Sequence, residues 1–287
     1  MKMEKVIKLY PGIAPGSENL NMEEEIYEDI RFGAMKKFSR NVTAPDMTAF
    51  IPEGGKDMSA VIIIAGGGFK RQSLGLEGYD VAAWLNSHGI AAFVLKTRLP
   101  MNEHAKRYDV LLMDAQRAVR IVRANAKEWG IREDSIGVMG FSAGGYQAAL
   151  VSTGFDINAG GIGDEIDKLS ARPDFCVLCY PVTSGRVPRN VGENNPIADY
   201  EIEQVATYKV VEMVSEQTPP LFIFETDDDT TTPAENSLLF YQAARANKVP
   251  AELHIFRNGK HGFGLGDDAA QTGQWKGLFL KWFETIV

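Results

Sequence analysis

The chain has 287 residues, of which 45% are hydrophobic and 24% charged, the composition of an ordinary globular protein. A formal net charge of -8 argues against a nucleic-acid-binding function, because phosphate contacts need clustered lysine and arginine, and it disfavours strongly anionic substrates. No stretch approaches the roughly 18 apolar residues of a membrane span, and the N-terminus MKMEKVIKLYPG has no signal-peptide core. The sequence as given therefore predicts a soluble cytoplasmic protein without membrane contacts.

The predicted elements fall into an N-terminal section and a regular section. Residues 1–55 carry the short strands VIKLY, IYEDIRF and TAFIP, joined by irregular loops. From residue 60, strands are predicted at residues 60–65, 90–95, 135–140, 175–180, 221–226 and 251–256. Helices are predicted through residues 81–88 and 108–129, and after Ala143, Pro233 and Thr272.

The strands after residue 60 are apolar throughout, which indicates a parallel sheet buried on both faces. Their alternation with helices is typical of right-handed βαβ units. The helix of residues 108–129 carries one apolar stripe at three-to-four spacing, and Gly130 is expected to stop it as a C-cap glycine. The predicted fold is a single α/β domain over residues 1–287, with a mostly parallel central sheet flanked by helices on both faces.

Residues 184–218 interrupt this rhythm with polar sequence that contains glycine and proline. So long a connection in a compact domain is usually functional. We interpret residues 184–218 as an inserted cap or substrate loop over the open end of the sheet.

The two cysteines, Cys176 and Cys179, lie in one predicted strand. Their odd offset of three residues places them on opposite faces of the sheet, where a disulfide between them is geometrically unfavourable. We interpret both as small buried hydrophobic residues rather than as a redox pair.

The run Gly140-Phe141-Ser142-Ala143-Gly144 matches the pattern G-x-S-x-G and lies between the predicted strand SIGVM and the predicted helix AGGYQAALVS. This is the context of a nucleophile elbow, in which glycines two residues to either side allow a strained turn. The turn raises the serine hydroxyl above the sheet, at a helix N-terminus whose dipole favours developing negative charge. The pattern predicts that Ser142 is a nucleophile.

Three consecutive glycines, Gly66-Gly67-Gly68, directly follow the predicted strand at 60–65. In folds that carry a nucleophile elbow, this loop and the residue after the serine supply the N–H groups of the oxyanion hole. The predicted donors are therefore Gly67, Gly68 and Ala143. A dinucleotide-binding loop would need a further glycine at position 71, which is Arg71, so no cofactor is predicted.

One of four histidines is expected to act as the base. His261 lies in the glycine-rich run NGKHGFGLG after the last predicted strand, which fits the chain order serine, acid, histidine. His88 is expected to cap carbonyls at a helix end, His104 to lie in the loop before the long helix, and His254 to be a satisfied residue of a strand.

The acid is expected directly after the strand at 221–226, where the chain reads Asp227-Asp228-Asp229. Only one carboxylate is needed to orient the imidazole. We favour Asp229, with Asp228 and then Asp227 as alternatives. The spacing differs from that of an EF-hand calcium loop, and histidine and cysteine do not cluster at ligand spacing, so no metal site is predicted.

Several runs together resemble the bacterial esterases related to acetyl xylan esterases, in the esterase/lipase or dienelactone-hydrolase-like branch of the α/β hydrolases. They are VTAPDMTAFIPEGG, AGGGF, DAQRAVRIVRANAKEWGIREDSIGVMGFSAGGYQAALVS, TPPLFIFETDDDTTTPAENS and VPAELHIFRNGKHGFGL. The resemblance extends from LYPGIAPGS to the last helix. It implies the α/β-hydrolase fold, catalytic roles for Ser142, Asp229 and His261, and an oxyanion loop at Gly67 and Gly68.

Two positions depart from the family pattern, because Ala65 and Tyr146 stand where many relatives have histidine. The expected function is a serine carboxylesterase that releases short acyl groups, acetyl in particular, from a small-molecule or oligosaccharide ester such as a plant-polysaccharide fragment. The alternatives are a small serine peptidase of the prolyl-oligopeptidase type and a non-catalytic ligand-binding homologue. The expected partner is the ester substrate, and a homodimer is left open.

Overall fold

The computed structural model of the protein describes residues 5–31, 33–100, 102, 104–105, 109–184 and 208–287. Most of the predicted cap or substrate loop at 184–218, namely residues 185–207, lies outside the described residues.

In the described part of the chain, eight strands form the central sheet, in the order β1-β4-β6-β5-β7-β8-β9-β10. The antiparallel pairs are β1 with β4 and β4 with β6, and every other neighbouring pair is parallel. The predicted mostly parallel sheet is confirmed. Its strands are β1 (Lys5–Lys8), β4 (Asp46–Phe50), β5 (Met58–Ile64), β6 (Ala91–Lys96), β7 (Ile131–Phe141), β8 (Cys176–Cys179), β9 (Leu221–Thr226) and β10 (Ala251–Phe256).

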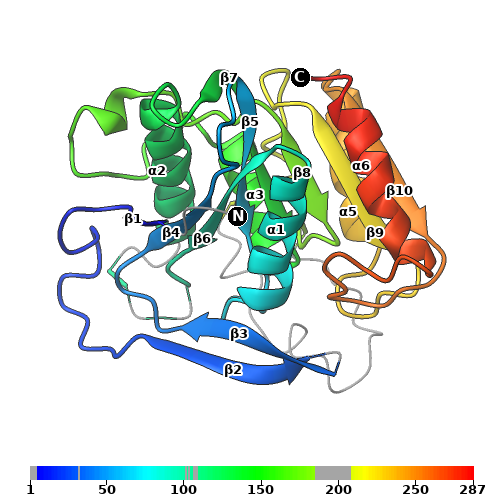
Figure 1. The fold of residues 1–287 in the computed structure, drawn as a ribbon, viewed down its shortest axis with the longest axis horizontal. Helices are drawn as coiled ribbons and strands as arrows, with labels where there is room; N and C mark the ends of the chain where they lie inside the picture. Colours follow the sequence, from blue (N-terminus) through cyan, green and yellow to red (C-terminus); the bar gives the residue numbers. More distant parts are fainter. Residues whose placement is uncertain (1–4, 32, 101, 103, 106–108, 185–207) are drawn as a thin grey trace.

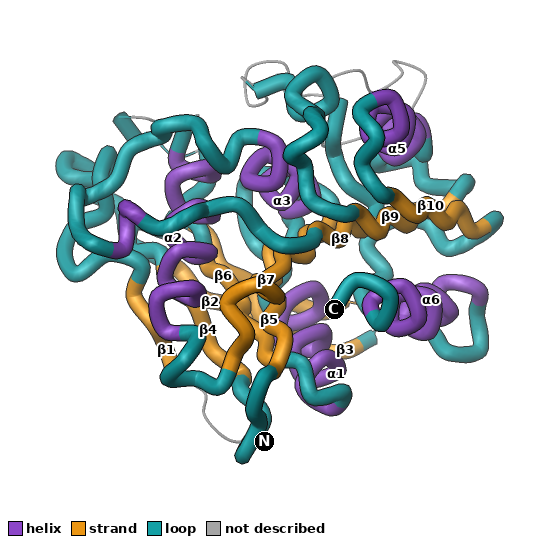
Figure 2. The backbone as a smooth tube through the Cα atoms, turned by 90° about the horizontal axis from the view of Figure 1, so that it is seen from above, coloured by secondary structure: helices purple, strands orange, loops and turns teal. Residues whose placement is uncertain are grey.

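Helices cover both faces of this sheet, as Figure 2 shows. On one face lie α2 (Val110–Asn125), α3 (Ala143–Thr153) and α5 (Glu235–Ala246), and on the other lie α1 (Asp80–Ser87) and α6 (Trp275–Phe283). Each face has its own apolar core, because strands with buried side chains on both sides need a cover on both sides. Among the described residues, no helix is long and apolar enough to cross a membrane.

The predicted long helix ends earlier than expected. α2 ends at Asn125 rather than near residue 129, and residues 126–130 form a turn in which the Ile131 N–H donates to the Ala126 carbonyl at 2.8 Å. Gly130 does adopt the left-handed conformation of a chain-reversing glycine, with φ of 67°. The turn brings Ile131 into register with Met58, so β7 begins before the predicted residue 135.

A separate two-stranded hairpin stands beside the central sheet (Figure 1). It pairs β2 (Glu25–Arg31) with β3 (Ala34–Arg40), a strand that the sequence analysis did not predict. Ser39 and Gln72 exchange backbone hydrogen bonds at 3.1 and 2.8 Å, which tie the hairpin to the loop after β5. The hairpin is therefore held next to the glycine loop at residues 66–68.

The cysteines and one of the other histidines lie as predicted. Cys176 and Cys179 are free and buried, and each belongs to the core of a different sheet face. The Nδ1 atom of His88 lies 2.9 Å from the Trp84 carbonyl oxygen at the end of α1, which is the predicted capping contact.

His254 is satisfied within β10, where its Nε2 atom lies 2.6 Å from a carboxylate oxygen of Glu252. His104 is buried in the loop before α2, with Nδ1 3.0 Å from the Ser17 hydroxyl. Both histidines thus have the structural surroundings that the sequence analysis expected.

Candidate active site

Ser142 occupies a strained turn between β7 and α3, with φ of 54° and ψ of -120°. Residues other than glycine rarely adopt a positive φ, because it strains the backbone, and backbone strain of this kind concentrates at functional sites. A Cβ atom at Gly140 would lie 2.2 Å from the Gly144 carbonyl oxygen, and one at Gly144 would lie 2.2 Å from that of Ile64. Both positions therefore require glycine, which confirms the steric reasoning applied to the G-x-S-x-G run.

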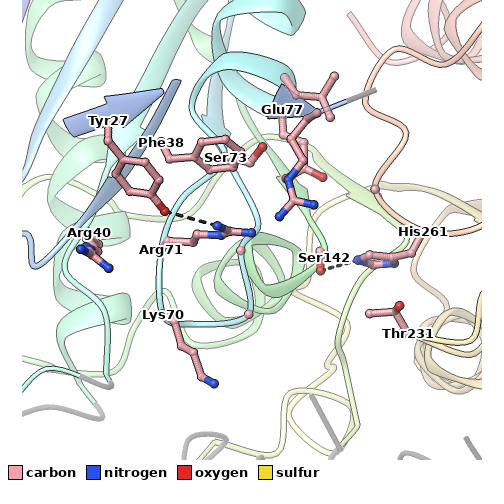
Figure 3. A pocket seen from close by; sticks show the side chains of 15 residues that line it. Tyr27, Phe38, Arg40, Lys70, Arg71, Ser73, Glu77, Ser142, Thr231 and His261 are labelled. Atoms are coloured by element: carbon pink, nitrogen blue, oxygen red, sulfur yellow. Dashed lines mark hydrogen bonds between the residues drawn. The ribbon is translucent and has the colours of Figure 1, made fainter. Parts of the chain in front are cut away.

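The structure joins Ser142, His261 and Asp229 in one hydrogen-bonded chain. The Nε2 atom of His261 lies 2.8 Å from Ser142 Oγ, the contact drawn as a dashed line in Figure 3, and Nδ1 lies 2.6 Å from Asp229 Oδ2. The N–H groups of Thr231 and Thr232 donate to the other carboxylate oxygen, Oδ1, at 2.7 and 2.8 Å. Because Oδ2 then faces the imidazole as an acceptor, it selects the tautomer with the proton on Nδ1, which leaves Nε2 free to accept from the serine.

The three consecutive aspartates have three different environments. Asp227 is exposed, whereas Asp229 is buried and contacts His261. Asp228 accepts the N–H groups of Gly259 and Lys260 at 2.8 and 2.9 Å, and these bonds hold the pKa of its carboxyl below the usual value. Asp228 thus fastens the loop that leads to the histidine, and only Asp229 touches the imidazole.

The glycine loop after β5 packs directly against the serine turn. A Cβ atom at Gly66 would lie 2.7 Å from both the Phe141 carbonyl oxygen and Ser142 Cβ. The Gly66 N–H is already used, because it donates to Glu77 Oε2 at 2.8 Å.

The N–H groups of Gly67, Gly68 and Ala143 have no acceptor among the described residues. Ala143 is the first residue of α3, where an N–H has no intrahelical partner. These three groups are therefore available to a substrate oxyanion.

Glu77 and Tyr180 form a buried link that no sequence motif marks. The Tyr180 hydroxyl donates to Glu77 Oε1 at 2.9 Å and accepts the Gly264 N–H at 3.0 Å, and its ring meets that of His261 edge-on with centroids 5.0 Å apart. Burial raises the pKa of the Glu77 carboxyl. The link connects the glycine loop, through Glu77, to the loop that carries His261.

Thr232 is a second contact that the sequence analysis missed. Its hydroxyl lies 3.0 Å from His261 Nδ1 and 3.1 Å from Asp229 Oδ2, and it also reaches the Tyr180 carbonyl oxygen at 3.1 Å. The only signal for it is the run of three threonines that directly follows the aspartates.

A cavity of about 470 Å³ opens over Ser142 (Figure 3). Its walls come from the serine and histidine loops, from the glycine loop, and from the β2–β3 hairpin. The space is larger than an acetyl group needs, so it can also hold the alcohol part of an ester.

A strained serine between strand and helix, a histidine after the last strand and a buried aspartate after the strand before it together define a serine hydrolase of the α/β type. The comparisons with known proteins agree with this class. A family model named BD-FAE matches residues 47–174, and the model of the prolyl oligopeptidase family matches residues 181–287.

Among curated proteins, the chain is 33% identical over 243 residues to an acetylxylan esterase of Xylanibacter ruminicola, covering 80% of this chain and 47% of the relative. It is 30% identical over 269 residues to endo-1,4-beta-xylanase B of Butyrivibrio fibrisolvens, covering 93% of this chain and 40% of the relative. The chain thus spans less than half the length of these two relatives.

Among solved structures, an acetyl ester-xyloside bifunctional hydrolase of Caldicellulosiruptor lactoaceticus superposes with a TM-score of 0.78 at 35% identity, covering 100% of this chain and 97% of that one. The chain therefore belongs to the α/β-hydrolase superfamily, in its bacterial esterase/lipase branch.

Proposed function

We propose that the protein is a serine carboxylesterase that hydrolyses short-chain acyl esters, acetyl esters in particular, on oligosaccharides or polysaccharide fragments. The observation that carries the proposal is the continuous chain Ser142 Oγ–His261 Nε2 and His261 Nδ1–Asp229 Oδ2, with distances of 2.8 and 2.6 Å. Hydrogen bonds of this length allow a proton to move from the serine as its oxygen attacks.

In the proposed first half-reaction, Ser142 Oγ bonds to the acyl carbon while its proton passes to His261 Nε2. The N–H groups of Gly67, Gly68 and Ala143 stabilise the negative charge that develops on the carbonyl oxygen. The bond between the acyl carbon and the alcohol oxygen then breaks, and His261 returns the proton to the leaving alcohol. Asp229 stabilises the imidazolium throughout.

In the second half-reaction, His261 removes a proton from a water molecule whose oxygen bonds to the acyl carbon. The bond to Ser142 Oγ breaks, the serine regains its proton, and the carboxylic acid leaves. The net reaction consumes one water and requires no cofactor.

The names of the relatives support acetyl esters of saccharides as the substrate class, since one is an acetylxylan esterase and another an acetyl ester-xyloside bifunctional hydrolase by name. The cavity over Ser142 is consistent with an alcohol larger than the acyl group. Residues 1–287 would then act as one domain, with residues 184–218 as a substrate loop.

The test is pre-steady-state hydrolysis of p-nitrophenyl acetate. We expect a burst of p-nitrophenolate close to one equivalent per active site if deacylation is the slower step, and an acetyl adduct on Ser142 in rapidly quenched samples analysed by mass spectrometry. Ser142→Ala should give neither. An adduct on another residue, or hydrolysis by Ser142→Ala at the wild-type rate, would contradict the proposal.

A small serine peptidase is the second candidate, because the prolyl oligopeptidase family model matches residues 181–287. Hydrolysis of proline-containing peptide p-nitroanilides at rates comparable to acetyl esters would favour this candidate over the esterase.

A further inference from the structure

The cavity over Ser142 differs in charge from the protein as a whole. The chain carries a net charge of -8, yet four of the cavity's lining residues are cationic, and Glu77 is the one carboxylate among the described residues that line it. The cations are Arg31, Arg40, Lys70 and Arg71. The expectation that acidity disfavours anionic substrates therefore does not hold at this site, because the local field depends on the nearest charges rather than on their sum.

Glu77 forms no salt bridge with the three arginines in the described part of the chain. Both of its oxygens are already hydrogen-bonded, one to the Gly66 N–H and the other to the Tyr180 hydroxyl. Its side chain is buried, and burial raises the pKa of the carboxyl. Four cations against this one carboxylate leave an excess of positive charge on the described lining of the cavity.

An aromatic pair on the hairpin orders the arginines. Tyr27 and Phe38 lie opposite each other in the β2–β3 register and stack with ring centroids 5.5 Å apart. The guanidinium of Arg71 lies 4.8 Å from the Phe38 centroid, and that of Arg31 lies 5.8 Å from it. Arg71 also donates to the Tyr27 hydroxyl at 3.3 Å (Figure 3). These contacts restrict the arginines without using up most of their N–H donors.

Two of the arginines have no carboxylate partner in the part of the chain that the structure describes. Arg40 pairs with Glu25 at 2.6 Å, whereas neither Arg31 nor Arg71 forms a salt bridge with a described residue. Ordered cations that face a cavity without a counter-charge are sites for an anionic ligand group.

We propose that the hairpin side of the cavity is a subsite for a carboxylate group on the saccharide that carries the ester, that is, for acetylated sugars of the uronic acid type. The inference rests on the proposed esterase function. Figure 3 shows Ser142 between His261 on one side and Arg71 and Tyr27 on the other. The subsite therefore lies on the side of Ser142 opposite His261. Guanidinium groups bind carboxylates through two parallel N–H···O bonds, and the cavity, at about 470 Å³, is large enough for a sugar ring.

The experiment compares acetylated methyl glucuronide with acetylated methyl glucoside, which differ only in carboxylate against hydroxymethyl. We expect wild-type kcat/KM to favour the glucuronide, and the ratio of the two values to fall about tenfold in Arg71→Gln and in Arg31→Gln, since a charge-assisted contact is of that order. Taking the ratio removes any general effect of a substitution on the glycine loop. The preference should also weaken as salt rises.

The matched control is Arg245→Gln. Arg245 is an exposed arginine on α5 that also stacks on a tyrosine, with its guanidinium 5.9 Å from the Tyr241 centroid, but it does not line the cavity. The ratio of kcat/KM for the glucuronide to kcat/KM for the glucoside should be the same in Arg245→Gln as in the wild type. An equal kcat/KM for both sugars in the wild type, or a ratio that Arg71→Gln and Arg31→Gln leave unchanged, overturns the subsite.

Two further substrates test which part of the ester bears the charge. If the arginine dependence appears with p-nitrophenyl hemisuccinate instead, the carboxylate belongs to the acyl group and the proposal is wrong. If acetylated methyl glucoside 6-phosphate shows the larger dependence, the ligand group is a phosphate and the proposal is equally wrong.

Calorimetric binding of the acetylated glucuronide and glucoside to Ser142→Ala separates this inference from the esterase function. Preferential, Arg71-dependent binding of the glucuronide supports the subsite even if the wild type hydrolyses neither ester. Equal binding overturns the subsite while the esterase function stands.

Discussion

Replacing each of the three aspartates at 227–229 by asparagine tests the proposed acid most sharply. In Asp229→Asn, Oδ1 must remain an oxygen, because the N–H groups of Thr231 and Thr232 both donate to it. The new NH₂ group therefore takes the place of Oδ2 and points at His261 Nδ1, 2.6 Å away in the wild type. It forces Nδ1 to act as an acceptor and places the imidazole proton on Nε2, where it blocks acceptance of the serine proton.

The expected loss in kcat is about 10⁴, or about 5 kcal/mol of transition-state stabilisation, from the tautomer change alone. Asp228→Asn should lower kcat by less than about tenfold, because the amide oxygen can still accept the Gly259 and Lys260 N–H groups and only the charge is lost. Asp227→Asn removes an exposed carboxylate and should stay within about 0.5 kcal/mol of the wild type in stability, with unchanged kcat.

The assay is kcat with p-nitrophenyl acetate at pH 8 for all three variants, with circular dichroism and thermal unfolding as the check on folding. Asp227→Asn serves as the matched control, since it makes the same chemical change in the same turn. The reasoning fails if folded Asp229→Asn keeps activity within tenfold of the wild type, or if Asp228→Asn loses as much.

Four other outcomes are expected. Ser142→Ala and His261→Ala should each lower kcat by about 10⁶ while remaining folded, and residual activity above a few per cent in a clean preparation would rule out the assignment. Acetyl esters should exceed butyryl esters in kcat/KM and octanoyl esters should react little; the reverse order in a p-nitrophenyl series would disprove this. Tyr180→Phe should lower the free energy of unfolding, measured by urea titration, by about 2 kcal/mol, since it leaves the buried partners of the hydroxyl unpaired, and kcat should fall as well. If neither the free energy of unfolding nor kcat changes, the link through Glu77 and Tyr180 is unimportant. Asp164→Asn should lower the free energy of unfolding by about 1 kcal/mol at pH 7, because Arg117 holds the pKa of the half-exposed Asp164 carboxyl at about 2, below an ordinary value near 3.8. The stabilisation by the ionised carboxylate is present above the unfolded pKa and is lost as pH falls toward 2. In urea titrations, the difference in free energy of unfolding between variant and wild type should therefore be smaller at pH 3 than at pH 7.

The features that the sequence alone predicted are those that depend on residues close together in the chain. The all-apolar strands required a sheet covered on both faces, and the glycines at 140 and 144 permitted the strained turn at Ser142. Each of these features depends on residues close together in sequence. The order of serine, acid and histidine along the chain, together with the strand that precedes each, then pointed to His261 and to a three-residue window for the acid.

Features made by distant segments could not be read in this way. The choice of Asp229 among three aspartates depends on which carboxylate the turn after β9 aims at His261, 32 residues away. The link through Glu77 and Tyr180 joins side chains 103 residues apart. Neither contact leaves a pattern in the chain, because sequence spacing carries no information about which long-range neighbours the packing will bring together.

The charge of the cavity shows most clearly the difference between what composition reports and what packing decides. Composition reports the sum of all charges, and that sum is negative. Packing of the β2–β3 hairpin against the loop after β5 brings Arg31 and Arg40 to the same cavity as Lys70 and Arg71, while most carboxylates lie elsewhere. Electrostatic interactions weaken steeply with distance in water and salt, so the substrate meets the charges that folding gathers around Ser142 rather than the total.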